Sequence, residues 1–319
     1  EKGSEPKLKA LGLGYTETWG SPELRKEISK LYSRTKPDEI LGLAGGEEGI
    51  FLFMNVFLER GDHVLVQFPG YQSLYEIARS IGCKVTKWTV RHEDGWELDA
   101  DFLRKSITKR TKAIVLNLPH NPTGYIPSKR KFKEIVDIAK ENDLHIFCDE
   151  VYRYLEYEEK DRLPSISDVY SKGVSLGVMS KTFGLPGLRI GWIATKDKGL
   201  LRRMASFKDY TSICSSAPSE FLSTLALRNR QHLGRRNLEI IDRNLRLLDK
   251  FFNRYSDLFE WVRPKAGSIA FPKILFKGDS EDLCTDVIEK KGVLLIPSSK
   301  FDFGKKHFRI GFGRKNMPE

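Results

Sequence analysis

The sequence has no run of about 20 apolar residues, so it predicts no transmembrane helix. Its first residues, 1–6, lack the apolar centre of a secretory signal. Cysteine is scarce, and the 4 cysteines (Cys83, Cys148, Cys214 and Cys284) form no CxxC pair, which argues against a disulfide framework or a structural zinc site. The 6 histidines show neither HxxxH nor HExxH spacing, so no metal site is expected. These absences favour a cytoplasmic protein without a membrane partner.

Positive charge is in excess, with 54 Lys and Arg against 43 Asp and Glu, a net charge of +11. Such an excess can indicate nucleic-acid binding, but here the basic residues are spread through mixed-sign segments such as 129–140 and 235–250. We therefore expect a solvated basic surface that attracts anionic substrates, and no nucleic-acid partner. With 40% apolar residues, the 319 residues suit a soluble globular chain with one large and one smaller domain.

Helical and strand patterns alternate along the first two thirds of the chain. Ser21 followed by Pro22 is a helix-start signal. The expected helices are 22–32, 46–58, 71–81, 99–106 and 128–141, and the expected strands are 62–68, 84–90, 112–117, 144–148, 174–178 and 190–194. Several of these strands are short and almost wholly apolar, which predicts an α/β fold whose mostly parallel central sheet is sandwiched by helices.

The pattern changes after residue 194. A polar segment (208–218) precedes long helical stretches over 219–252. Short strands at 268–271, 293–296 and 307–312 then flank a helix near 282–290, which predicts a smaller C-terminal α+β domain. The predicted division is an N-terminal segment (1–30), a large domain (31–215), and a connecting helix with the small domain (216–319).

Polar side chains follow three of the expected strands, where parallel sheets bind their ligands. Asn121 lies in a loop that two prolines and a glycine fix. Asp149 follows a buried strand, where a carboxylate is costly without a cation or strong donor, and Tyr152 can aim its hydroxyl at the same place. Lys181 follows a third strand, and partial desolvation there lowers the pKa of an amine and makes it nucleophilic. Arg189 returns to this edge after a glycine-rich turn, and its guanidinium suits a phosphate.

Taken singly, each of these residues has an ordinary explanation: a turn, a structural carboxylate, a surface lysine. Their combination is more specific. A carboxylate that holds a pyridinium N–H, an amine that forms an imine and an arginine for a phosphate together describe a pyridoxal phosphate pocket.

Three motifs in this order resemble those of the class I and II aminotransferases, which are fold-type I pyridoxal-phosphate enzymes. They are Asn-Pro-Thr-Gly at 121–124, Asp-x-x-Tyr at 149–152 and Ser-Lys-Thr-Phe-Gly-Leu-Pro-Gly-Leu-Arg at 180–189. Tyr15, the turn at 45–50 and Arg309 extend the resemblance over nearly the whole chain. The resemblance implies a pyridoxal-phosphate-dependent aminotransferase that moves an amino group from an amino acid to a 2-oxo acid.

The resemblance also implies roles for single residues. Lys181 forms the internal aldimine and later moves the proton between the substrate Cα and the cofactor. Asp149 pairs with the pyridinium nitrogen, and Tyr152 and Asn121 hydrogen-bond the phenolic oxygen. Tyr71, after the strand at 62–68, matches the aromatic residue that stacks on the ring.

At the phosphate end, Gly46 and Glu47 match the start of a helix whose backbone N–H groups hold the phosphate, together with Ser180 and Arg189. This chain departs from the family twice there. The family usually has Ser or Thr where Glu47 stands, so only the backbone of Glu47 is expected to bind. Many relatives also have a hydroxyl residue where this chain has Val178, which removes one phosphate hydrogen bond.

Two further residues bear on the subunits and the substrate. Tyr15 resembles the tyrosine that reaches a neighbouring subunit's phosphate, which implies a homodimer with a shared active site and an N-terminal segment in the dimer contact. Arg309 resembles the arginine that binds the substrate α-carboxylate, with Asn121 beside it. Members of the family usually have additional residues at both ends of the chain, and these residues often contact the substrate side chain. The resemblance therefore leaves the donor amino acid open.

Two other functions remain open at this point. The same cofactor and fold support a lyase, a decarboxylase or an amino-acid cyclase such as capreomycidine synthase, because the sequence does not reveal which substrate bond stands perpendicular to the ring. A regulatory module that senses cofactor is the non-enzymatic alternative. Such modules normally carry a separate DNA-binding domain, of which the sequence gives no sign.

Overall fold

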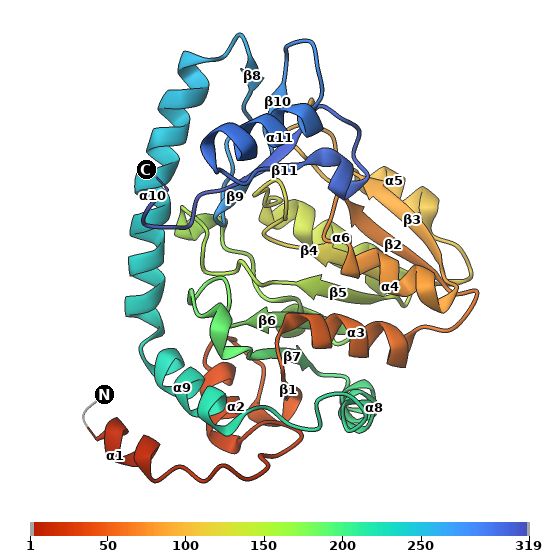
Figure 1. The fold of residues 1–319 in the computed structure, drawn as a ribbon. Helices are drawn as coiled ribbons and strands as arrows, with labels where there is room; N and C mark the ends of the chain where they lie inside the picture. The colour runs from red at the N-terminus through yellow and green to blue at the C-terminus, as the bar shows by residue number, and fades with distance from the viewer. Residues whose placement is uncertain (1–2, 318–319) are drawn as a thin grey trace.

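The centre of the computed structural model is a sheet of seven strands, counted over residues 3–317, which the structure describes (Figure 1). Its order is β1-β7-β6-β5-β4-β2-β3. Five neighbouring strands, β6, β5, β4, β2 and β3, are all parallel to one another. Strand β7 runs antiparallel to both β6 and β1. The strands are β1 (Ile40–Leu43), β2 (His63–Phe68), β3 (Lys84–Thr89), β4 (Thr111–Asn117), β5 (His145–Asp149), β6 (Gly173–Val178) and β7 (Gly191–Thr195).

Helices cover both faces of this sheet because its strands are apolar on both faces. Val64 and Val66 of β2 point to one face, where they pack with α3, α4 and α8, while Leu65 packs on the other face with α5 and α6. The helices of this lobe are α2 (Pro22–Ser29), α3 (Gly46–Phe57), α4 (Ser73–Ile81), α5 (Ala100–Ser106), α6 (Lys129–Glu141), α7 (Ile166–Val169) and α8 (Lys198–Lys208). The predicted mostly parallel, helix-covered sheet is confirmed.

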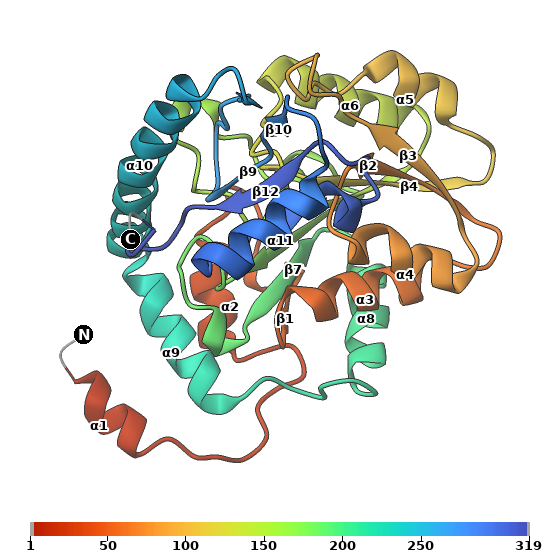
Figure 2. The same ribbon diagram turned by 45° about the horizontal axis from the view of Figure 1, so that its top comes forward.

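A smaller lobe follows two helices (Figure 2). Its sheets are antiparallel, with β12 between β11 and β9, and β10 beside β8. The elements are α9 (Ala217–Arg228), α10 (Arg230–Arg254), β8 (Phe259–Glu260), β9 (Ile269–Ala270), β10 (Lys273–Ile274), α11 (Ser280–Lys291), β11 (Ile296–Pro297) and β12 (Phe308–Gly311). This agrees with the predicted α+β character, while the exact division at residues 215 and 216 stays a prediction.

Some predicted elements differ from the structure. The strand predicted at 293–296 is wrong, because Val293 and Leu294 are exposed and only Ile296 and Pro297 pair with β12. The helical stretches predicted over 219–252 are found as two helices that meet at Asn229, whose side chain donates to the Leu225 carbonyl. The sequence patterns also missed β1 and α8.

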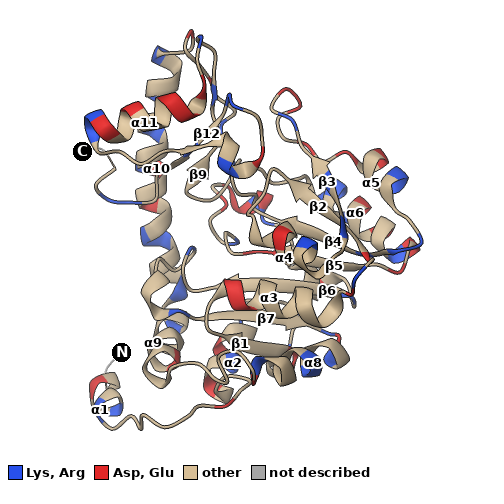
Figure 3. Ribbon diagram, turned by 45° about the vertical axis from the view of Figure 1, so that its right-hand side comes forward, with Lys and Arg blue, Asp and Glu red and all other residues tan. Residues whose placement is uncertain are grey.

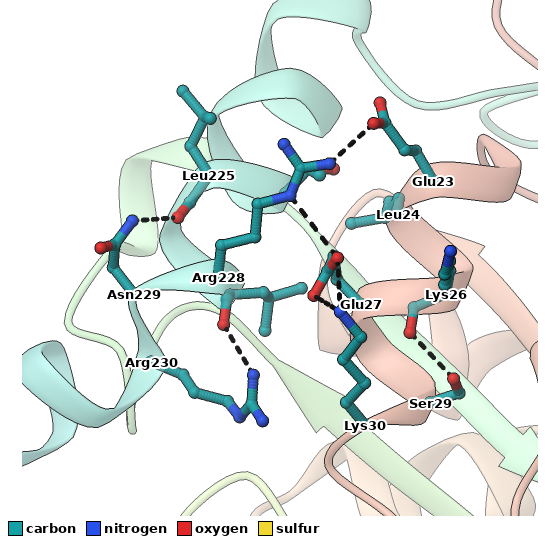
Figure 4. A network of polar contacts seen from close by, with 12 residues as sticks. Glu23, Leu24, Lys26, Glu27, Ser29, Lys30, Leu225, Arg228, Asn229 and Arg230 are labelled. Atoms are coloured by element: carbon teal, nitrogen blue, oxygen red, sulfur yellow. Dashed lines mark hydrogen bonds and ion pairs between the residues drawn. The ribbon is translucent and has the colours of Figure 1, made fainter. Parts of the chain in front are cut away.

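Thr16 and helix α2 join the N-terminal segment to the rest of the chain. An ion-pair network joins α2 to α9: Arg228 contacts Glu23 at 2.7 Å and Glu27 at 3.5 Å, and Lys30 contacts Glu27 at 2.8 Å (Figure 4). The preceding helix α1 (Ser4–Lys9) buries no residue and projects away from the body in Figures 1 and 2.

The surface carries both signs of charge, as the mixed-sign segments predict. Figure 3 shows Lys and Arg interspersed with Asp and Glu over α5, α6 and α11. Within residues 3–317, we find no helix with the length and apolarity that crossing a membrane demands.

Candidate active site

The predicted strand-end residues meet at one edge of the sheet. Strands β4, β5 and β6 are parallel neighbours, and Asn117 at the end of β4 is in register with Asp149 at the end of β5. Asn121 follows β4 and Lys181 follows β6, so both leave the sheet at the same edge as Asp149. The parallel topology therefore gathers an amide, a carboxylate and an amine into one place.

Asp149 is a nearly isolated buried carboxylate. Its residue is 5% exposed, and the Val151 N–H donates to Oδ1 at 3.1 Å. The pKa of Asp149 is raised from 3.8 to about 7, mainly by burial and in smaller part by Glu47, while the Val151 N–H and Lys181 oppose the rise. A carboxylate in this state gains free energy from a bound cation or a strong N–H donor.

Lys181 is solvent-accessible, yet its amine lies in a partly desolvated place. Partial burial lowers the pKa of Lys181, and the positive charges of Arg309 and Arg189 lower it further. Its Nζ lies 5.9 Å from the centroid of the Tyr152 ring. Tyr152 itself is buried, and burial raises the pKa of its hydroxyl to about 12, so this hydroxyl is protonated and able to donate. The site thus offers an amine with an increased neutral fraction beside a phenolic donor.

Arg309 reaches the same site from the smaller lobe. It lies on β12, and its Nη1 donates to Oδ1 of Asn121 at 3.1 Å. Its guanidinium also lies over the ring of Phe301, 5.5 Å from the centroid. Both contacts fix the guanidinium beside Asn121 and leave other N–H groups for a carboxylate.

The start of α3 and the guanidinium of Arg189 form the phosphate end of the site. Gly45 precedes α3 with φ of 104°, and a Cβ at this position would stand 2.7 Å from Nη2 of Arg189. Only glycine therefore allows the guanidinium to approach the helix N-terminus this closely. A Cβ on Gly46 would meet Cγ1 of Val178 at 2.9 Å, so an apolar side chain lies against the start of α3.

Tyr71 and Glu47 lie together on one side of the site. Tyr71 follows β2 and is partly exposed. Burial and the adjacent carboxylate of Glu47 raise the pKa of Tyr71 to about 12. Glu47 is exposed at the first turn of α3, so it places a negative charge at the phosphate end of the site. Ser180, half-buried, directly precedes Lys181.

Tyr15 is the one candidate that the fold does not bring to this site. It is 90% exposed in the segment between α1 and α2. Nothing within residues 3–317 covers this ring, and its predicted role needs a second chain.

Two supporting residues, Asn117 and His120, were not found from the sequence. The Asn117 side chain accepts from the Asn121 N–H at 2.6 Å and donates to the Asp149 carbonyl at 2.9 Å, which joins the two strand ends. The His120 ring donates from Nε2 to the Pro69 carbonyl at 2.7 Å and accepts at Nδ1 from the Thr123 hydroxyl, also at 2.7 Å. It thus ties the Asn121 loop to the segment before Tyr71. Asn117 could have been found from its place at the end of an apolar strand.

The residues present fit pyridoxal phosphate. The isolated carboxylate of Asp149 matches a pyridinium N–H, and Lys181 lies at the next strand end. The cradle of Gly45, Arg189 and the N-terminus of α3 suits a phosphate. Two carboxylates in the first turn of α3, those of Glu47 and Glu48, carry charges that oppose a phosphate there.

The chain is similar to proteins of one family. The family model for class I and II aminotransferases matches residues 9–317. A probable aspartate aminotransferase of Methanocaldococcus jannaschii is 28% identical over 94% of this chain and 81% of its own length. Capreomycidine synthase of Streptomyces vinaceus is 27% identical over 92% of this chain and 75% of its own length.

Solved structures agree with this similarity. A pyridoxal-phosphate-dependent aminotransferase from Streptococcus suis superposes with a TM-score of 0.92 at 36% identity, covering 97% of this chain and 81% of its own. A mutant aspartate aminotransferase of Thermus thermophilus gives a TM-score of 0.90 at 25% identity, covering 98% and 86%.

Proposed function

This chain belongs to the class I and II aminotransferase family, and we propose that the strand-end site around Lys181 is its active site. The protein is a pyridoxal-phosphate-dependent enzyme that moves an amino group from an amino acid to a 2-oxo acid. The observation that carries the proposed site is the meeting of two perturbed groups, the amine of Lys181 and the carboxylate of Asp149, at adjacent strand ends.

When bound, pyridoxal phosphate supplies a ring that accepts electrons from the substrate Cα. In our proposal, Lys181 binds the cofactor through its Nζ. The same amine accepts the proton from the substrate Cα and donates it again in the later step of amino transfer. Its lowered pKa suits both roles, because a neutral amine is needed at each step. Asp149 keeps a proton on the ring nitrogen, and burial strengthens this charge-assisted contact.

The remaining residues orient the reactants. We assign the substrate α-carboxylate to Arg309, whose guanidinium Asn121 holds in place. Tyr152 and Asn121 donate to the phenolic oxygen of the cofactor. Arg189, Ser180 and the backbone N–H groups of Gly46 and Glu47 bind the phosphate, and Tyr71 stacks on the ring.

Elimination, decarboxylation and cyclisation are not favoured. The similar chains include aspartate aminotransferases from several archaea at 28% identity, each matched over more than nine tenths of this chain. A regulatory module is likewise not supported, because the family match and these relatives indicate an enzyme.

A product-resolved screen tests the proposed function. The purified protein with pyridoxal phosphate is offered amino acids and 2-oxo acids in pairs, and products are followed by mass spectrometry. We expect each mole of donor consumed to give one mole of its 2-oxo acid and one of the new amino acid. Release of ammonia or carbon dioxide without the new amino acid contradicts transamination. Lys181→Ala provides the inactive control.

We further propose a homodimer in which each site receives Tyr15 from the other subunit. The segment after Tyr15 is fixed, since Thr16 donates to the Ser215 carbonyl at 2.8 Å and the Ser21 N–H donates to Glu220 at 2.9 Å. Tyr15 therefore emerges from an anchored point into solvent. An open hollow of about 500 Å³ beside the phosphate end, bordered by Glu47 and Phe51, offers space for a residue of the other subunit.

Subunit mixing tests the shared site. The Lys181→Ala and Tyr15→Ala proteins are each expected to have low activity. The two are mixed, unfolded and refolded together so that hybrid dimers form. In a shared-site dimer, each hybrid holds one intact site, so about a quarter of the wild-type activity returns. Activity that stays at the average of the two parents contradicts the shared site, and a monomeric mass in light scattering contradicts the dimer.

We also propose that the protein works in the cytoplasm. All four cysteines are free, and Cys83, Cys148 and Cys284 are buried as thiols. Unpaired thiols fit a reducing compartment. Fractionation of the native host with an antibody to the full-length protein would test this location, and recovery in a secreted or membrane fraction contradicts it.

A further inference from the structure

Two asparagines of α10 contact the two halves of the proposed site. The Asn237 amide donates to the carbonyl of Thr182, the residue after Lys181, at 2.8 Å. The Asn244 amide donates to the carbonyls of Phe312 at 2.8 Å and Arg314 at 2.7 Å, directly after the strand that carries Arg309. The two asparagines are about two helical turns apart, so their side chains leave the helix on the same face.

The contact at Lys181 is well anchored. Thr182 is buried, and its hydroxyl donates to the carbonyls of Val151 and Arg153 in the turn after Asp149. On the α10 side, Arg236 donates to Oδ1 of Asn237 at 3.2 and 3.0 Å, which fixes the amide with its NH₂ group towards Thr182. The backbone beside Lys181 is therefore held between the Asp149 turn and α10.

Close packing supports the same contact. Gly184 has φ of +67°, and a Cβ there would stand 3.0 Å from Nδ2 of Asn237. Glycine thus serves two needs at this position, a left-handed backbone and room for the helix.

The contact of Asn244 with the segment after β12 is buried. Asn244 is 0% exposed, and around it Leu245 and Leu248 of α10 share an apolar cluster with Phe308 and Phe312. The Phe312 N–H also donates to the Ser268 carbonyl at 2.8 Å. Strand β12 is therefore attached to α10 by both apolar packing and hydrogen bonds.

We propose that α10 sets the separation between the amine of Lys181 and the guanidinium of Arg309, with Asn237 and Asn244 as its positioning residues. This inference rests on the proposed roles of Lys181 and Arg309. A substrate bridges the two groups, because its α-carboxylate binds Arg309 and its Cα proton goes to Lys181. A continuous helix about 10 Å long between the asparagines is stiff on this scale, and small misplacements of reacting groups reduce rates by up to about a hundredfold.

The test compares two donors that differ only in the carboxylate. Single-turnover amino transfer to the enzyme-bound cofactor is followed by absorbance, first with an amino acid and then with the primary amine that lacks its carboxylate. Asn244→Ala is expected to lower the rate with the amino acid about tenfold and leave the rate with the amine unchanged, because the amine does not use Arg309. Asn237→Ala is expected to slow both donors, because both need Lys181.

Matched variants complete the experiment. Asn253→Ala, an exposed position on the same helix, is expected to change neither rate. Asn244→Ser keeps one hydrogen-bond donor in a smaller side chain, and it is measured in parallel because Asn244 is buried. Asn244→Ser is expected to lower the ratio of the amino-acid rate to the amine rate, as Asn244→Ala does, but by a smaller factor.

The outcomes separate this inference from the proposed function. Arg309→Lys must reduce the amino-acid rate relative to the amine rate, and if it does not, the assigned role of Arg309 fails. If Arg309→Lys changes that ratio but both Asn244 variants leave it at the wild-type value, the role of α10 is overturned while the proposed function stands. Equal losses on both donors in the Asn244 variants likewise overturn it, because they indicate a merely structural residue.

Discussion

Arg309 on β12 donates a hydrogen bond of 3.1 Å to the side-chain oxygen of Asn121, which lies 188 residues earlier in the chain. The bond joins the smaller lobe to the loop after β4. It brings the proposed carboxylate-binding group next to the proposed cofactor-binding groups, so that substrate and cofactor can meet between the lobes.

Arg309→Lys tests this arrangement in the steady state. A lysine keeps the positive charge but cannot bind Asn121 and a carboxylate with one planar group. We expect KM for the amino acid to rise about tenfold or more, with a smaller change in kcat. Arg314→Lys, an exposed position on the same segment, is the control. An unchanged KM in Arg309→Lys contradicts the role.

Lys181→Ala is expected to remove both activity and covalent attachment. Without the amine, the proton at Cα has no acceptor, and we expect kcat to fall by a factor on the order of a thousand or more. Borohydride reduction followed by peptide mass spectrometry is expected to find the cofactor on Lys181 in the wild type. Attachment to a different lysine would falsify the assignment. Lys129→Ala, an exposed position, serves as the control.

Asp149→Asn is expected to change the pH dependence of stability in the cofactor-free protein. The folded-state pKa of Asp149 is raised from 3.8 to about 7. Its contribution to stability is therefore complete below about pH 4 and is lost as the pH rises through about 7. Asparagine has no such ionisation. At about pH 8, the cofactor-free variant should thus be more stable than the wild type by on the order of a few kcal/mol.

Thermal unfolding at about pH 4 and about pH 8 measures this difference, which should vanish at the lower pH. The same variant is expected to bind pyridoxal phosphate more weakly, since the ring nitrogen loses its counter-charge. A variant that is no more stable than the wild type at the higher pH contradicts the raised pKa.

Glu47→Thr is expected to tighten cofactor binding. The substitution removes a negative charge from the phosphate end and adds the hydroxyl that the family usually has. Because Glu47 is exposed, solvent screens its charge, and we expect the Kd of pyridoxal phosphate to fall only severalfold. The difference from the wild type should shrink as salt is added, since salt screens the repulsion that Glu47 exerts. Fluorescence titration of the cofactor-free protein measures this Kd. Glu59→Gln is the control at an exposed site, and weaker binding in Glu47→Thr contradicts the prediction.

Local sequence patterns predicted the part of the site that lies on one sheet. Asp149 and Lys181 follow apolar strands, and parallel neighbours deliver their carboxyl ends to a common edge. The resemblance added Arg309 and Tyr15. The strand expected at 293–296 begins only at Ile296, because an apolar run does not reveal which of its residues the partner strand β12 reaches.

The sequence by itself determined the chemistry of this protein, because strand periodicity and the motifs after each strand end are local properties. Only the tertiary structure decided how the two lobes meet. The bond between Arg309 and Asn121, the hold of α10 on Thr182 and Phe312, and the exposure of Tyr15 all depend on packing between segments far apart in the chain. No local pattern encodes such contacts, since they form only when both lobes have folded and their apolar surfaces have paired.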